Sequence, residues 1–90
     1  MPLIKRALRE ARQKVGLSQE AFGEALREAR ERAGISQEAL ALEAGRHRSY
    51  VSDLERGKYS ASIKTLFLLA EVLETTPSKL LRRVEELLDR

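Results

Sequence analysis

Apolar side chains recur every three or four residues along almost the whole chain, and no stretch alternates strictly between apolar and polar positions. This spacing is typical of amphipathic helices, whereas strands alternate with a period of two. The sequence therefore predicts an all-α fold. Glycines and capping residues divide the pattern into about six helices. The expected helices cover residues 3–15, 18–33, 36–44, 48–56, 63–74 and 77–88, with Gly16, Gly34, Gly45 and Gly57 as ends and Ser18, Ser36, Ser62 and Thr76-Pro77 as starts.

A repeat occupies the N-terminal half. Residues 7–23 and 25–41 are identical at 11 of 17 positions, with an offset of 18 residues. That offset equals five turns of about 3.6 residues, so a duplication inside a helix keeps its apolar face in phase. The unit is too short for a solenoid repeat. We interpret residues 1–24 as an N-terminal helical extension and residues 25–90 as the domain, with a dimerisation helix at its C-terminal end.

Composition narrows the function. The 90 residues contain no cysteine and one histidine, so we expect no disulfide, metal or other cofactor. No apolar run approaches the roughly 20 residues that span a bilayer, and the N-terminus lacks a signal peptide's apolar stretch. We expect a cytoplasmic, nucleoid-associated protein with no membrane partner. No nucleophile–base pair is present in a catalytic spacing, so we expect no enzyme.

Positive charge is concentrated in one segment. Residues 46–64 contain five basic and two acidic residues, a net +3, which equals the net charge of the whole chain. A local basic excess favours a polyanionic partner.

The same segment follows a tight corner between two short helices. Residues 36–57 read SQEALALEAGRHRSYVSDLERG, and Leu40 and Ala44 would face Val51 and Leu54 across Gly45. The first copy of the repeat has no such continuation, so we assign the functional corner to the second copy.

These residues, with the Leu-x-x-Leu-Ala pattern that follows them, resemble the phage repressor/Cro, or xenobiotic-response-element (XRE), helix-turn-helix family over about residues 26–81. The HRSYVSDLERG and EELLDR stretches also resemble the controller regulators of restriction–modification systems. The resemblance implies five core helices, with an extra N-terminal helix in this chain. It also implies that residues 48–56 form a recognition helix in the DNA major groove.

The resemblance assigns residues to three roles. The positions that reach base edges are His47, Arg48, Ser49, Ser52 and Asp53. The positions that hold the DNA backbone are Gln37, Arg56, Lys58, Tyr59, Ser60 and Lys64. Arg46 departs from the family, which usually has a small or apolar residue after the turn glycine, and we expect its long side chain to extend toward phosphate. Tyr50 is a further phosphate candidate, with core packing as an equal alternative. Arg30 and Glu55 match an ion pair that ties the first helix to the recognition helix.

Side-chain chemistry agrees with the base-reading role. The planar donor fork of Arg48 suits guanine O6 and N7, and Ser49 and Ser52 are short enough for close approach to the groove floor. Asp53 would repel phosphates. Its carboxylate must therefore face a cytosine amine, a nearby arginine or solvent.

Both ends of the chain carry surfaces with two interpretations. We predict a homodimer interface at Leu68, Val72, Leu80, Leu81, Val84, Leu87 and Leu88, against the alternative that the last helix folds back on its own domain. For the N-terminal copy we favour a helix packed on the domain or on a second chain. The alternative is a basic arm that touches flanking DNA, and the mixed charges of this segment weaken it. The basic residues of that arm would be Lys5, Arg6, Arg9, Arg12 and Lys14.

The sequence thus predicts a homodimeric transcription regulator that reads a palindromic operator in double-stranded DNA, and the family resemblance implies a repressor. RNA polymerase and a cognate toxin are further candidate partners. The alternative function is that of an antitoxin-like or adaptor protein that acts through its C-terminal helices.

Overall fold

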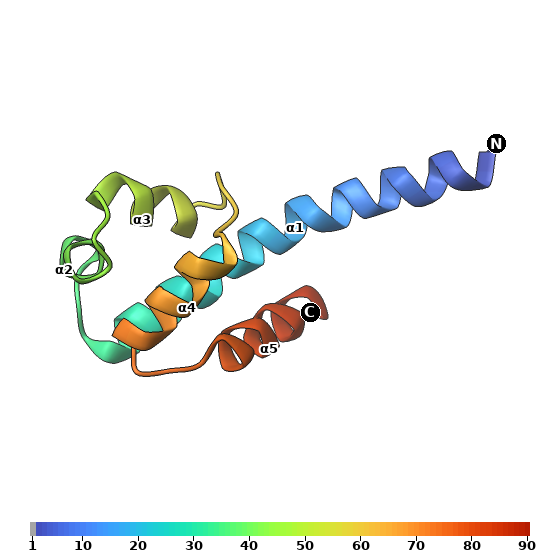
Figure 1. The fold of residues 1–90 in the computed structure, drawn as a ribbon. Coiled ribbons are helices and arrows are strands. Elements are labelled where there is room, and N and C mark those ends of the chain that lie inside the picture. The colour runs from blue at the N-terminus through green and yellow to red at the C-terminus, as the bar shows by residue number, and fades with distance from the viewer. Residues whose placement is uncertain (1) are drawn as a thin grey trace.

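The computed structural model describes residues 2–90, which contain five helices and no strand (Figure 1). The helices are α1 (Pro2–Ala33), α2 (Gln37–Glu43), α3 (Arg48–Glu55), α4 (Ile63–Val72) and α5 (Pro77–Leu88). The predicted all-α class and the phage-repressor-like arrangement are confirmed, with five helices instead of about six.

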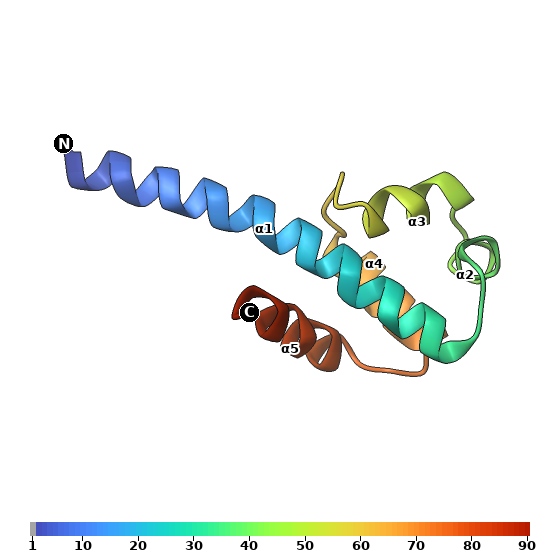
Figure 2. The same cartoon turned by 180° about the vertical axis from the view of Figure 1, so that it is seen from behind.

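The difference in number lies in α1, which is one continuous helix where the sequence predicts two. Gly16 does not end the helix, and Ser18 does not cap a new one, because its hydroxyl donates to the Lys14 carbonyl at 2.8 Å. Residues 2–24 of the predicted N-terminal extension therefore form the greater part of α1 and are not a separate element; residue 1 lies outside the described residues. Residues 4–17, which we call the arm, are all exposed and project from the rest of the molecule (Figures 1 and 2).

The other helix boundaries follow the expected capping chemistry. Each later helix begins with an N-cap residue whose side chain accepts a hydrogen bond from a backbone N–H of the first turn. These residues are Ser36, His47, Ser62 and Thr76. Gly34, Gly45 and Gly57 have φ values of 72°, 67° and 75°, the left-handed conformation that favours glycine after a helix end.

The core lies where α1, α2, α3 and α4 meet. Leu40, Val51 and Leu54 are completely buried, and Ala44 is buried beside them, as the predicted corner requires. Phe67 lies in the apolar helix α4 but is 59% exposed, because α4 turns that position to solvent.

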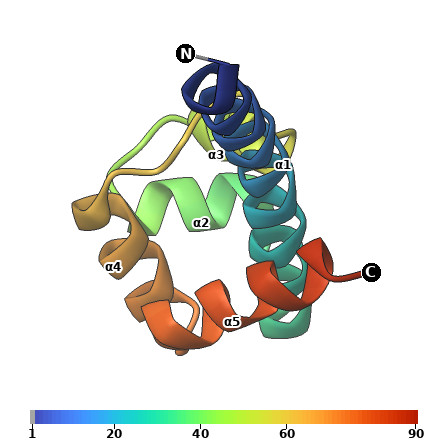
Figure 3. The same ribbon diagram turned by 90° about the vertical axis from the view of Figure 1, so that its right-hand side faces the viewer.

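Helix α5 folds back along α1, on the side away from α3 (Figures 1 and 3). Its apolar residues Leu80, Val84 and Leu87 are buried in their own chain. Arg83 adds a bidentate contact, since its Nε and Nη2 donate to the carboxylate of Glu28 at 2.8 and 3.1 Å.

This packing corrects the predicted dimer interface. Leu80, Val84 and Leu87 have almost no surface left for a partner chain, so the folded-back alternative holds for them. Val72 is half-buried against the core, and Leu88 is half-buried against a smaller cluster of Ala21, Ala25, Val84 and Leu87 between α1 and α5. Leu68 and Leu81 remain exposed, at 36% and 45%.

Candidate nucleic-acid interface

Helices α2 and α3 are joined by a well-defined turn. After the C-cap at Ala44, the Gly45 N–H donates to the Leu42 carbonyl at 3.1 Å and the Arg46 N–H to the Ala41 carbonyl at 2.8 Å. This is the hydrogen-bond pattern of a Schellman helix end. The turn therefore accommodates Arg46, which is exposed and whose Nη2 donates to Thr65 Oγ1 in α4 at 3.2 Å.

A buried polar network fixes α3 relative to α1 and α2. Arg30 Nε and Nη2 donate to the two carboxylate oxygens of Glu55 at 2.6 and 3.0 Å, and Arg30 Nη1 donates to the Ile35 carbonyl at 3.0 Å. The Arg30 and Glu55 side chains are only 14% and 3% exposed. Hydrogen bonding to Glu55 raises the pKa of the Arg30 guanidinium above its ordinary value. The predicted ion pair is confirmed by this geometry.

Gln37 belongs to the same network. It is the first residue of α2, and its Nε2 donates to Glu55 at 3.0 Å. The predicted phosphate contact of Gln37 would therefore have to come from its backbone amide at the helix start, or from a rearranged side chain. Its side chain serves here to orient α2 against α3.

A glycine permits the close approach of α1 to α3. A Cβ added at Gly23 would lie 2.5 Å from the carbonyl oxygens of both Leu54 and Glu55. Only a residue without a side chain fits between these backbones. Sequence reasoning missed this role. The available signal was that Gly23 lies seven residues, or about two turns, before Arg30 and therefore on the face of α1 that meets α3.

The outer face of α3 is free of internal contacts at its N-terminal end. Arg48 and Ser49 are exposed, and Ser52 is half-buried one turn further on. The Arg48 guanidinium forms no ion pair or hydrogen bond with any of residues 2–90. Five guanidinium N–H donors are thus available to an external acceptor.

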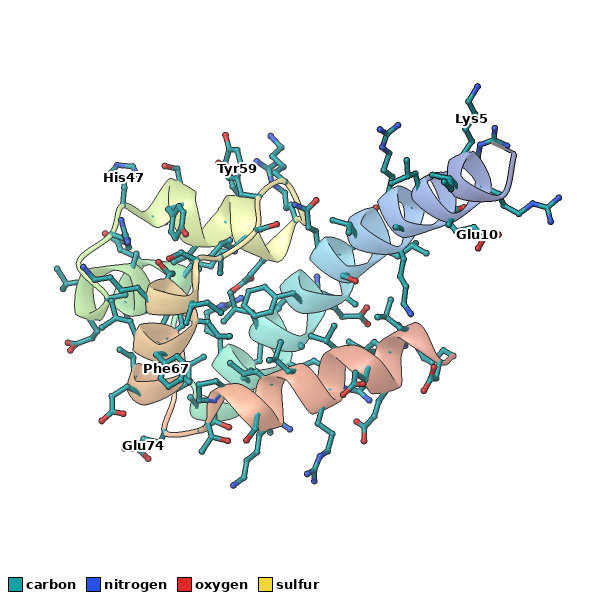
Figure 4. All side chains as sticks on the ribbon, turned by 45° about the vertical axis from the view of Figure 1, so that its right-hand side comes forward. Lys5, Glu10, His47, Tyr59, Phe67 and Glu74 are labelled. Carbon is teal, nitrogen blue, oxygen red and sulfur yellow. The ribbon has the colours of Figure 1, made fainter. Side chains whose placement is uncertain are left out.

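His47 stands at the start of this face and caps α3. Its Nδ1 accepts the Ser49 N–H at 3.1 Å, which leaves Nε2 as the donor of the neutral ring. The ring projects from the molecule on the same side as Tyr59 (Figure 4).

The carboxylate of Asp53 has local partners. Arg56 Nη2 lies 3.0 Å from Asp53 Oδ1, and Lys58 Nζ lies 4.0 Å from the same atom. Of the alternatives left open by the sequence, the nearby arginine holds in this structure. The pairing also reduces the repulsion that Asp53 would exert on a phosphate.

The predicted phosphate-binding residues surround α3. The exposed members are Arg46, Arg56, Lys58, Tyr59, Ser60 and Lys64, from the corner, the α3–α4 loop and the start of α4. Tyr50 is half-buried against the core, and the Arg46 guanidinium lies 5.3 Å from the centre of its ring. The structure thus supports a packing role for Tyr50 and brings the cations around one end of the molecule.

A contact between Gln19 and Ser60 was not anticipated from the sequence. The Gln19 side-chain amide donates to the Ser60 hydroxyl and so joins α1 to the α3–α4 loop. These residues are 41 positions apart, and no local pattern connects them.

A braced pair of short helices, with a cationic surface around the outer helix, defines a helix-turn-helix protein of the DNA-binding class. The sequence pattern of the helix-turn-helix family matches residues 26–80. The chain belongs to this family of XRE-type DNA-binding regulators. The match covers α2, α3 and α4 completely, but it leaves out the arm and most of α5.

Solved structures agree with the family. The clp gene regulator ClgR from C. glutamicum is similar with a TM-score of 0.75 and 29% identity, over 77% of this chain and 88% of that one. The restriction-modification controller protein C.AhdI from Aeromonas hydrophila has a TM-score of 0.70 and 40% identity, over 72% of this chain and 94% of that one. The controller protein C.Esp1396I shares the fold, with a TM-score of 0.73, 23% identity, and coverage of 81% and 96%. Among curated protein sequences, none matches.

Within residues 2–90, every helix is too short or too polar to cross a lipid bilayer.

Proposed function

We propose that the protein is a homodimeric transcription regulator that binds a palindromic operator in double-stranded DNA and reads it with α3 in the major groove. The observation that carries this proposal is that α3 is fixed from behind and free in front. Glu55, on its inner side, is held by Arg30 and Gln37, whereas Arg48 on its outer side has no partner among the described residues.

The roles within α3 follow from the side chains. Arg48 would donate to guanine O6 and N7, and such a bidentate pair discriminates by about 1–3 kcal/mol. Ser49 and Ser52 permit close approach, and His47 offers Nε2–H as a donor to a base edge. Asp53 would accept from a cytosine amine only after release from Arg56, so its base-reading role is the most costly of the set.

The cationic and polar residues around α3 would hold the duplex in register. Lys58, Tyr59 and Ser60 lie in the loop after α3, and Lys64 lies in the first turn of α4. Contacts from such residues to phosphate carry no sequence information, but they fix the position of the recognition helix.

A second copy of the chain would bind at an apolar groove of about 290 Å³ between α1, α4 and α5. Val15, Ile63 and Leu81 line it and are 58%, 71% and 45% exposed. The apolar surface continues along the arm through Leu8 and Ile4, at helical spacing from Val15. We therefore propose the interface at this groove, with Leu81 kept from the predicted set; Leu68 does not line the groove. A self-complementary contact here would give the two-fold symmetry that a palindrome requires.

Selection of bound sites from random duplexes tests the proposal. We expect a palindrome whose half-sites are about one helical turn, or 10 base pairs, apart. The Arg48→Ala variant should lose its preference at one position in each half-site. Recovery of no preferred sequence by the wild-type protein would refute sequence-specific reading, and a single unpaired half-site would refute the dimer.

A further inference from the structure

The arm carries the charge excess of the chain. Residues 4–17 contain five basic residues and one acidic residue, a net +4, whereas the other residues contain 12 basic and 13 acidic ones, a net −1. All residues of the arm are exposed, and none forms an ion pair with another of the described residues. A segment with this unpaired charge suits a polyanionic partner. In the proposed function, the DNA bound by the helix-turn-helix unit is such a polyanion.

Three of the five basic residues form one stripe along the arm. Lys5, Arg9 and Arg12 are separated by four and three residues, so they lie on one face of the helix. At the same spacing this stripe continues through Gly16 to Gln19.

The continuation of the stripe faces the recognition helix. Gln19 donates to Ser60 in the α3–α4 loop, and Gly23, four residues further, lies against the last carbonyls of α3. Because α1 is continuous from Pro2 to Ala33, its faces keep their direction along the arm. The basic stripe therefore points to the same side of the molecule as α3.

The figures agree with this orientation. The N-terminal end of α1 and helix α3 lie on one side of the molecule, and α5 lies on the other (Figures 1 and 3). In Figure 4 the Lys5 side chain extends to the side of His47 and Tyr59, whereas Glu10 extends to the opposite side. The acidic residue of the arm would thus be turned away from a duplex bound at α3.

We propose that Lys5, Arg9 and Arg12 bind the phosphates of DNA outside the segment that α3 reads. The inference rests on the proposed function, because α3 must first place the duplex on this side. The arm is about 21 Å long at 1.5 Å per residue. That length corresponds to about six base pairs, given a rise of about 3.4 Å per phosphate along one strand. The arm would enlarge the binding site without adding base specificity.

The test compares wild-type protein with the triple variant Lys5→Ala, Arg9→Ala, Arg12→Ala. The matched control is Arg32→Ala, Lys79→Ala, Arg82→Ala, which removes the same charge from exposed residues around a hollow between α1 and α5. Alanine favours helix at every one of these exposed positions, so both variants should retain the helical signal and melting temperature of the wild type.

Affinity is measured for the selected operator as a function of salt, in a minimal duplex and in one extended by about 10 base pairs on each side, a span that exceeds the reach of the arm. Each lost phosphate contact lowers the salt slope by about 0.9, so the arm variant should lose about 2–3 units per protomer on the long duplex. Between 50 and 200 mM salt, its affinity should then fall about 40-fold less per protomer than that of the wild type. The arm variant should also gain nothing from the extended flanks, whereas the wild type and the control should gain affinity.

The outcomes separate the two proposals. A wild-type protein without sequence preference would refute the proposed function itself. If the preference is present but the arm variant keeps the wild-type slope and flank dependence, the arm does not bind DNA. An unchanged slope together with weaker self-association in sedimentation would assign the stripe to a second copy, and would also overturn the inference. Equal effects of the arm and control variants would indicate only the loss of net charge.

Discussion

Two glycines of α1 should respond in opposite ways to the same substitution. Gly16 and Gly23 both lie in the helix interior, where alanine is favoured over glycine by about 1 kcal/mol. Nothing lies within 4 Å of a Cβ added at Gly16. We therefore expect Gly16→Ala to stabilise the protein by about 0.5–1 kcal/mol.

At Gly23 the same methyl group would meet the end of α3. Its distance of 2.5 Å to the Leu54 and Glu55 carbonyl oxygens is about 1 Å shorter than a normal contact. Both contacts are with backbone atoms, which no rotamer change can move, so α1 and α3 would have to separate. Overpacking of this kind costs about 1–3 kcal/mol. Because backbone atoms cannot give way, we expect a cost in the upper part of this range, about 2–3 kcal/mol. After subtraction of the helix-propensity gain of about 1 kcal/mol, the net loss is about 1–2 kcal/mol.

Thermal and urea denaturation of the three proteins measure this difference. For a domain of this size, 1 kcal/mol corresponds to about 4–8 °C in Tm, so Gly23→Ala should melt roughly 4–16 °C below the wild type and Gly16→Ala a few degrees above it. Gly23→Ala should also weaken operator binding, because α3 is displaced from its brace. Equal melting temperatures for the two variants would show that α1 and α3 are not in close contact, and the packing argument would fail.

Four further outcomes are expected. Arg48→Ala should reduce discrimination between operator and unrelated duplex by about 1–3 kcal/mol in a competition assay, and unchanged selectivity would remove Arg48 from the base-reading set. Lys64→Ala should weaken binding evenly across sequences and lower the salt slope by about one unit; a sequence-dependent loss would contradict a phosphate contact. Leu81→Asp should weaken self-association about 100-fold in sedimentation, because each of two symmetric sites loses roughly 1.4 kcal/mol of apolar contact, while the monomer stays folded. Arg83 holds the pKa of Glu28 below its ordinary value of 4.5, so their contact stabilises the fold above that pH and the contribution is lost as pH falls through the lowered pKa. Glu28→Gln should therefore be less stable than wild type at pH 7, with a difference that closes in acid; a difference independent of pH would exclude this ion pair as its cause.

Local chemistry was sufficient to predict much of the site. The helix class follows from the apolar spacing, and the starts of α2, α4 and α5 follow from Ser36, Ser62 and Thr76, because a capping oxygen satisfies N–H groups within its own turn. The ion pair of Arg30 with Glu55 could be named because the family resemblance includes it.

Surface assignments were less reliable, since burial depends on segments distant in sequence. The apolar stripe of α5 predicted an interface, but Leu80, Val84 and Leu87 pack on α1 instead. An apolar stripe indicates only that one face of a helix is buried. The tertiary structure decides whether the same chain or another chain buries it. The approach of Gly23 to α3 was equally invisible, because it depends on how two helices cross.

The two copies of the repeat show most clearly the difference between a local sequence signal and its use in the tertiary structure. Residues 16–21 read GLSQEA and residues 34–39 read GISQEA, so the same capping signal occurs twice. At the second copy, Gly34 adopts a φ of 72°, Ser36 caps α2, and the chain turns. At the first copy the helix continues through Gly16 without interruption.

The sequence by itself determined that both copies can be helical and that both carry a signal to turn. Only the tertiary structure decided which signal is used. A turn after Ala33 places Leu40 and Ala41 in the core and lets Arg30 donate to the Ile35 carbonyl. Residues 4–17 are all exposed, so no burial of side chains would stabilise a turn at Gly16. Without tertiary contacts to compensate for broken helical hydrogen bonds, the continuous helix is the more stable state.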